Sequence, residues 1–177
     1  MNALDLRQQL DMVRQIAVPS TAQVLSTLSR IDYADAFLVE AGPARQWSAE
    51  QCARAVIDGA PLAVRANLLL GWLAIGLKPA IGGSRQSILG WEIRASAPEF
   101  VVLGRPSLIG MPAELLLKRE HGAILFCTFV QRDSHIASAV WAAVKPTHRR
   151  VLRRLLEHAG RRFADPVAAR ERAPQGV

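Results

Sequence analysis

Residues 123–156, AILFCTFVQRDSHIASAVWAAVKPTHRRVLRRLL, contain a predicted strand followed at once by a long predicted helix. The run at 123–131 is apolar throughout, which is typical of a buried strand. Asp133 and Ser134 are suited to cap a helix, and apolar residues then recur at helical spacing as far as Phe163. We therefore expect the last strand of a sheet to lead directly into a long C-terminal helix.

Both faces of the strand at 123–131 are apolar, although the outer face of a one-sided antiparallel sheet is normally polar. The two faces carry Ile124, Phe126 and Val130 on one side, and Leu125, Cys127 and Phe129 on the other. A second layer should therefore cover this sheet. The N-terminal helix or a second subunit would supply it, and the second option predicts a homodimer.

The residues before this strand predict an antiparallel meander. In SILGWEIRA, residues 87–95, apolar and polar positions alternate, and Leu89 and Trp91 share one face. EFVVLGR, residues 99–105, forms the next expected strand, and another runs through 108–120 to a tight turn. No helix signal interrupts this part of the chain.

The N-terminal half contains the other expected helices. Apolar spacing predicts a helix at 3–17, and a strand is expected at 35–40. Ser48 and Gln51 form a capping box at the start of a further helix. The next helix, at about 61–77, is apolar nearly all round, so we expect it to be buried on most sides.

This order predicts an α+β fold, since it lacks the strand–helix alternation of a parallel sheet. The order, with ILGWEI (88–93), TFVQ (128–131) and the helix carrying Trp141, Pro146 and His148, resembles the START-like or helix-grip superfamily (polyketide cyclase-like, SRPBCC). It is similar to a bacterial uncharacterised group within that superfamily. The resemblance implies a curved antiparallel sheet wrapped around a long C-terminal helix, with a cavity between them.

Three segments follow from this interpretation. Residues 1–30 form an N-terminal helical extension, residues 31–163 form the START-like domain, and residues 164–177 form a disordered tail. The resemblance supplies a fold and a cavity but no catalytic residues.

His148 is the polar residue that we expect on the cavity side of the C-terminal helix. An apolar stripe through Leu152 extends backward through His148 to Trp141, so the imidazole faces inward. There it would bind a ligand or transfer a proton. The alternative is a core histidine bonded to a backbone carbonyl that Pro146 has freed, because proline removes a helical hydrogen bond.

Four arginines flank this stripe, namely Arg149, Arg150, Arg153 and Arg154. Residues 145–162 carry seven basic residues and one acidic residue, so this segment holds most of the formal net charge of +7. The arginines either form a solvated face or contact an anionic lipid surface, an acidic partner or RNA. RNA is not favoured, because the region lacks exposed aromatic residues for stacking.

Trp72, Trp91 and Trp141 lie on three elements that would surround the expected cavity, and they serve either as ligand contacts or as core. Glu92 and Glu114 are expected to face away from it. No carboxylate pair, metal motif, nucleotide loop or catalytic triad is evident, so we expect no cofactor or metal. The two cysteines lack a CxxC spacing and are expected to be reduced core residues.

The apolar segment at 67–77 is too short to span a bilayer, and the N-terminus lacks a secretory signal pattern, so a cytoplasmic protein is expected. The leading hypothesis is a START-like protein that binds a hydrophobic small molecule or lipid in its cavity. One alternative is a cyclase or dehydratase that uses His148 as acid or base. The other is an interaction module that docks its arginine-rich helix on a partner.

Overall fold

The structure is a computed structural model that describes residues 12–42, 46–78 and 86–164. Its centre is a curved, seven-stranded antiparallel sheet in the order β1-β2-β7-β6-β5-β4-β3. The strands are β1 (Val13–Ile16), β2 (Tyr33–Glu40), β3 (Ser87–Ile88), β4 (Trp91–Ser96), β5 (Phe100–Arg105), β6 (Ala113–Glu120) and β7 (Ala123–Val130). The helices are α2 (Ser20–Gln23), α3 (Ala49–Ile57), α4 (Leu62–Ala74) and α5 (His135–Ala164).

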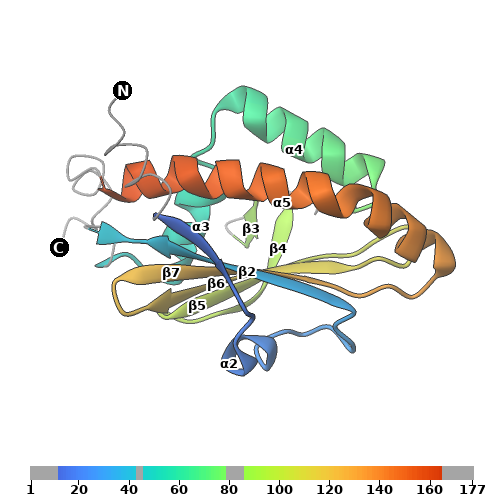
Figure 1. The fold of residues 1–177 in the computed structure, drawn as a ribbon, viewed down its shortest axis with the longest axis horizontal. Helices are drawn as coiled ribbons and strands as arrows, with labels where there is room; N and C mark the ends of the chain where they lie inside the picture. The colour runs from blue at the N-terminus through green and yellow to red at the C-terminus, as the bar shows by residue number, and fades with distance from the viewer. Residues whose placement is uncertain (1–11, 43–45, 79–85, 165–177) are drawn as a thin grey trace.

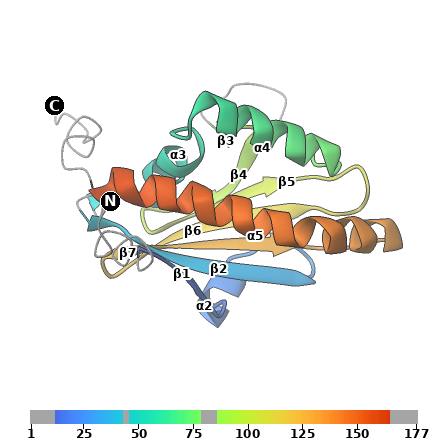
Figure 2. The same cartoon turned by 45° about the horizontal axis from the view of Figure 1, so that its top comes forward.

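The sheet separates two layers of different thickness. α3, α4 and α5 lie on one face, while the short α2 lies on the other (Figure 1). α5 crosses β1 and β2 and packs against α3, and α4 runs beside α5 as the outermost element in both views (Figure 2). The predicted α+β class, antiparallel sheet and long C-terminal helix are therefore confirmed, and the arrangement is consistent with a helix-grip fold.

α5 begins as the sequence predicts. The hydroxyl of Ser134 accepts a hydrogen bond from the amide of Ala137 at 3.0 Å and donates one to the carbonyl of Ile109 at 2.9 Å, which ties the helix start to the β5–β6 loop. Pro146 lies inside the helix, which bends in its N-terminal part (Figure 1), as expected where a proline removes a backbone hydrogen bond.

The second apolar face of β7 is covered by the chain itself. Ala22 of α2 and the apolar residues on either side of it pack on this face of the sheet, around Leu125, Cys127 and Phe129. Glu114 anchors the cover, because its buried carboxylate accepts hydrogen bonds from the Ser26 hydroxyl and from the amide and hydroxyl of Thr27. The two-sided strand is therefore explained without a second subunit, and the homodimer stays a prediction.

The expected helix at 3–17 is wrong for its last turn, since Val13–Ile16 form β1. Residues 3–11 lie outside the described part of the chain. β1 pairs along β2 in antiparallel register, and Val13 is buried in the main core. Pairing at the edge of the sheet and burial of Val13 thus override the helical spacing seen in the sequence.

The segment SILGWEIRA is a tight hairpin and not one continuous strand. Leu89 and Gly90 have φ values of 45° and 76°, and Ile88 pairs directly with Trp91. Two consecutive residues with positive φ between paired strands are typical of a type I′ turn. The predicted shared face of Leu89 and Trp91 is therefore wrong, because Leu89 lies in the turn.

α3 confirms the predicted capping box, in which Ser48 and Gln51 exchange hydrogen bonds. α4 contradicts the expectation of burial, since it contains no buried residue. Leu62 and Leu70 are 77% and 66% exposed. The physical reason is that α3 and α5 already cover the sheet, so α4 packs above them by only one edge.

No single helix among the described residues has the length and apolar character needed to cross a membrane. α3 and α4 meet that criterion only when taken together, and they are bent by 95° relative to each other.

Candidate functional site

A cleft lies between α4 and α5, and we call it the interhelical cleft. Its inner part has a volume of about 230 Å³ and reaches down to Leu115 of β6 and Phe126 of β7. The walls are mostly apolar and include Leu68, Gly71 and Trp72 on α4, and Trp141, Val144, Thr147, His148, Val151, Leu152 and Leu155 on α5. His148 is the one titratable side chain among the residues that line this inner part.

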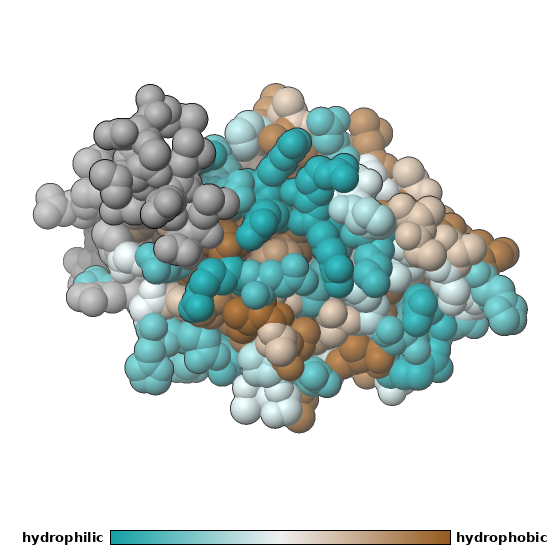
Figure 3. All heavy atoms as spheres, viewed as in Figure 1, coloured by the Kyte–Doolittle hydropathy of each residue, from teal (hydrophilic) through white to brown (hydrophobic). Residues whose placement is uncertain are grey.

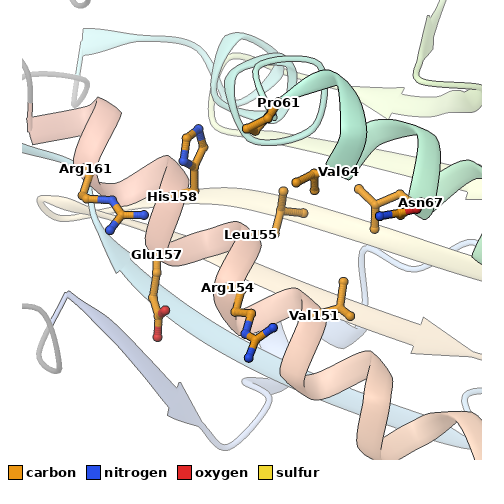
Figure 4. A pocket seen from close by; sticks show the side chains of 10 residues that line it. Pro61, Val64, Asn67, Val151, Arg154, Leu155, Glu157, His158 and Arg161 are labelled. Carbon is orange, nitrogen blue, oxygen red and sulfur yellow. The ribbon is translucent and has the colours of Figure 1, made fainter.

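The outer part of the cleft has a volume of about 510 Å³ and shares Asn67, Leu68, Val151 and Leu155 with the inner part. Leu155 and His158 extend from α5 towards α4, whereas Arg154 and Glu157 extend away from it (Figure 4). The outer end of the cleft is thus lined partly by charged residues, whereas its inner part is mostly apolar.

His148 contacts a buried carboxylate that strand β2 carries on the face of the sheet under the helices. Its Nε2 lies 3.3 Å from Oδ2 of Asp35, whose side chain is 1% exposed, while the imidazole itself is 20% exposed. Asp35 faces the helices because it alternates along β2 with Ala34 and Ala36, which face the opposite layer. The sheet therefore fixes the position of the carboxylate, and α5 places the imidazole between it and the cleft.

Tyr33 and Arg149 complete a hydrogen-bonded chain around this pair. The Tyr33 hydroxyl donates to Oδ2 of Asp35 at 2.7 Å and accepts from Nε of Arg149 at 3.0 Å. The Tyr33 ring packs against Trp141 at a centroid distance of 4.8 Å, and Trp141 packs against His148 at 5.2 Å. The aromatic rings pack against the imidazole, while the hydrogen bonds hold Tyr33 against the carboxylate that the imidazole contacts.

Burial raises the pKa of Asp35, but hydrogen bonding and charge attraction from His148, together with the hydrogen bond from Tyr33, outweigh it. The net effect is a pKa below the ordinary value, so the carboxyl is ionised at neutral pH. Within the part of the chain that the structure describes, Oδ1 of this carboxylate and Nε1 of Trp141 have no hydrogen-bond partner. Buried polar atoms normally have one, and Trp141 lines the cleft, so its indole N–H is suited to donate to a polar group of a ligand.

We predict that Tyr33 titrates with a pKa of about 12. Burial, the hydrogen bond to Asp35 and the negative charge of Asp35 raise this pKa, and they outweigh Arg149, which lowers it. Tyr33 is the single tyrosine of the chain, so tyrosinate absorbance during an alkaline titration reports it directly. The neutral phenol stabilises the folded state fully below its ordinary pKa of 10.0, and this stabilisation is lost as the pH rises to about 12.

Two variants move this titration in opposite directions. Asp35→Asn is expected to lower the pKa of Tyr33 towards 10.0, and Arg149→Gln is expected to raise it. Circular dichroism recorded at each pH ensures that the absorbance belongs to folded protein. A wild-type midpoint near 10.0 in the folded state would contradict the described contact between Tyr33 and Asp35.

The structure brings four of the five predicted ligand contacts to one place. Trp72, Trp141, His148 and Leu152 line the inner part of the cleft. Trp91 is buried beneath Trp72, with ring centroids 5.3 Å apart, and does not line it.

The four arginines divide into two groups. Arg149 belongs to the hydrogen-bonded chain around Asp35, whereas Arg150, Arg153 and Arg154 are exposed. Figure 3 shows hydrophilic side chains over the middle of α5 and hydrophobic ones towards the end where α4 ends and α5 begins. Docking of this basic face on a partner stays a prediction.

Sequence reasoning missed Asp35 and Tyr33. In the sequence, Asp35 was used only as the first residue of an expected strand. The signal that could have identified it is a charged residue at an inward position of a mostly apolar strand. Glu92 is exposed, as expected, and Glu114 faces away from the cleft but is buried under the Ser26–Thr27 segment. Among the described residues, no group of three or more possible metal ligands comes together.

No family model matches the chain, and no curated protein matches it. A solution NMR structure of a protein from Arthrobacter aurescens is similar with 13% identity and a TM-score of 0.38, covering 85% of this chain and 100% of that one. CalU16 from Micromonospora echinospora is similar with 14% identity and a TM-score of 0.32, covering 74% of this chain and 87% of its own. The function is therefore argued from the site.

Proposed function

We propose that the protein binds a hydrophobic small molecule or lipid in the interhelical cleft, with His148 as the polar contact at its floor. One observation carries the proposal: an apolar cleft whose inner part, among the described residues, contains a single titratable side chain, which contacts a buried carboxylate. Ligand sites usually combine apolar walls with a few well-placed polar groups.

The size of the cleft supports a ligand larger than water. The inner part alone, at about 230 Å³, lies just below the 300–1,000 Å³ typical of ligand pockets, and it continues into the outer part of about 510 Å³. Trp141, whose buried indole nitrogen has no hydrogen-bond partner among the described residues, lines the inner part. A ligand with a long apolar body and one hydrogen-bonding end fits this distribution.

The same arrangement supports a START-like assignment, in which a ligand lies between the sheet and the C-terminal helix. The cleft is bounded by the sheet, by α5 and also by α4. α4 contains no buried residue, which gives the ligand a wall that adjusts without disturbing the core.

Native mass spectrometry of the purified protein tests the proposal. We expect a population whose mass exceeds that of the polypeptide by one bound small molecule, which organic solvent releases. The same protein should enhance the fluorescence of anilinonaphthalene sulfonate after extraction. Protein that carries no molecule and does not bind this dye would contradict the proposal.

The contact between His148 and Asp35 favours catalysis as a second candidate function. A carboxylate that orients an imidazole is a frequent feature of general acid–base sites, and His148 faces the space where a ligand would lie. A cyclisation or dehydration of the bound molecule is the reaction class that our sequence interpretation suggests.

The same spectrometric measurement on His148→Gln separates the two functions. If His148 catalyses a reaction, the variant retains substrate while the wild type retains product, so the bound molecules differ in mass. Identical bound molecules in both proteins would contradict catalysis by His148 and leave binding in place. His121→Gln, in the exposed turn between β6 and β7, is the matched control.

A further inference from the structure

Arg105 is a buried cation beside the cleft. It is the last residue of β5, it is 1% exposed, and its Nε donates to the carbonyl of Gly90 at 3.0 Å. Both terminal nitrogens, Nη1 and Nη2, are buried and have no hydrogen-bond partner among the described residues. An uncompensated buried charge costs several kcal/mol, so this arrangement calls for a partner.

Two indoles surround the guanidinium without satisfying it. Its central carbon lies 4.9 Å from the ring centre of Trp72 and 5.5 Å from that of Trp91. Cation–π contacts of this kind stabilise the charge by about 0.5–2 kcal/mol, but they accept no hydrogen bond from the terminal N–H groups. Nε1 of Trp91 is also buried and unpaired, so unpaired donors gather in one place.

No carboxylate of the described residues pairs with Arg105. Its paired residue on the neighbouring strand β6 is Ala113. Burial lowers the pKa of the Arg105 guanidinium to about 10. A group with that pKa stays positively charged at neutral pH. The described residues therefore supply no counter-charge for this guanidinium.

Trp72 links this cation to the interhelical cleft. The same indole lines the inner part of the cleft and covers the guanidinium. Leu115, at the floor of the cleft, is two residues along β6 from Ala113 and lies on the same face of the sheet. Trp72 therefore lies between the lining of the cleft, to which it belongs, and Arg105, which does not line it.

We infer that the cleft ligand carries a carboxylate, which binds the two free terminal nitrogens of Arg105 and the indole N–H of Trp91. This inference rests on the proposed function and names the chemical class of its ligand: an apolar carboxylic acid. The planar guanidinium matches a carboxylate through two parallel hydrogen bonds. Three buried donors without an acceptor become satisfied in a single step.

The carboxylate reaches Arg105 when Trp72 moves aside. Trp72 is partly exposed and packs on the edge of the main core, and the helix that carries it has no buried residue, so movement of this indole displaces no buried side chain of α4. Regions with few buried apolar contacts open at low free-energy cost. The indole thus covers the cation in the empty protein and yields to the ligand.

Binding of cis-parinaric acid and of its methyl ester, measured by fluorescence, tests the inference. We expect the wild type to bind the acid at least about tenfold more tightly, because only the acid forms charge-assisted hydrogen bonds with the two terminal nitrogens. Arg105→Met should bind acid and ester alike, with the ester affinity unchanged. Arg94→Met, which removes an exposed arginine of the adjacent strand β4, should behave as the wild type.

The outcomes separate this inference from the proposed function. Equal affinity of the wild type for acid and ester overturns the carboxylate site and leaves apolar binding in place, whereas no affinity for either overturns both. Loss of ester binding in Arg105→Met would show that the arginine only shapes the cleft, which also overturns the inference. The variant should fold, because replacing a buried unpaired charge by an apolar side chain is often stabilising.

Discussion

Asp35→Asn is expected to lower the free energy of unfolding by about 3 kcal/mol at neutral pH, since it removes a buried charge that holds two partners. His148 and Tyr33 both direct polar atoms at this carboxylate. The amide has the same shape but presents a donor to groups that are themselves donors. Urea denaturation followed by circular dichroism measures the loss.

The pH dependence of this loss has a definite sign. The pKa of Asp35 in the folded protein lies below its ordinary value of 3.8, so its contribution to stability is complete above that value and is lost as the pH falls through the lower folded pKa. The difference between wild type and variant should therefore be largest at neutral pH and shrink in acid. A difference that does not change between neutral pH and the acid range would contradict this account.

Asp58→Asn is the matched control for Asp35→Asn. Asp58 forms an ion pair with Arg54 at 3.7 Å, and both side chains are 34% exposed. Pairs of this kind contribute less than about 1 kcal/mol. A loss of stability in Asp58→Asn as large as that in Asp35→Asn would show that burial does not distinguish the two carboxylates.

Gly71→Leu is expected to weaken binding of cis-parinaric acid and its methyl ester alike, by at least about tenfold, or about 1.4 kcal/mol. A Cβ atom at Gly71 meets no heavy atom within 4 Å, and the residue lines the inner part of the cleft. The leucine side chain therefore enters the space that a ligand needs. Removal of a helix-interior glycine should also stabilise the fold by up to about 1 kcal/mol.

Gly71→Ala separates these two effects. It provides the gain in helix stability but adds only one methyl group, so binding should stay close to that of the wild type. Fluorescence titration with the probe gives the affinities, and urea denaturation gives the stabilities. Unchanged affinity in Gly71→Leu would place the ligand outside the inner part of the cleft.

Part of the site follows from the sequence because α5 is amphipathic. Trp141, His148 and Leu152 recur at spacings of seven and four residues, which brings them to one face of any helix. The inward direction of the imidazole was therefore predictable, and the structure confirms it. Its contact with Asp35 was not predictable, because Asp35 lies on a strand distant in the sequence. Only the packing of α5 over β2 brings the two side chains together.

The error at α4 has a different physical origin. An apolar helix is expected to be buried because water-exposed apolar surface is costly, but hydropathy does not distinguish the core from the wall of a cleft. Arg105 illustrates a related limit, because in the sequence it only ended a strand before Pro106. Its burial between Trp72 and Trp91 depends on contacts among three elements that no local pattern encodes.

The outer position of α4 also bears on how such a protein diversifies. Most substitutions on a helix without buried residues leave the packing of sheet, α3 and α5 unchanged, so they are tolerated more readily than substitutions at Phe37 or Phe126. Selection can then alter the shape of the ligand wall while the scaffold is conserved. Descendants of one ancestral chain would in this way acquire new ligands mainly through mutations at 62–74.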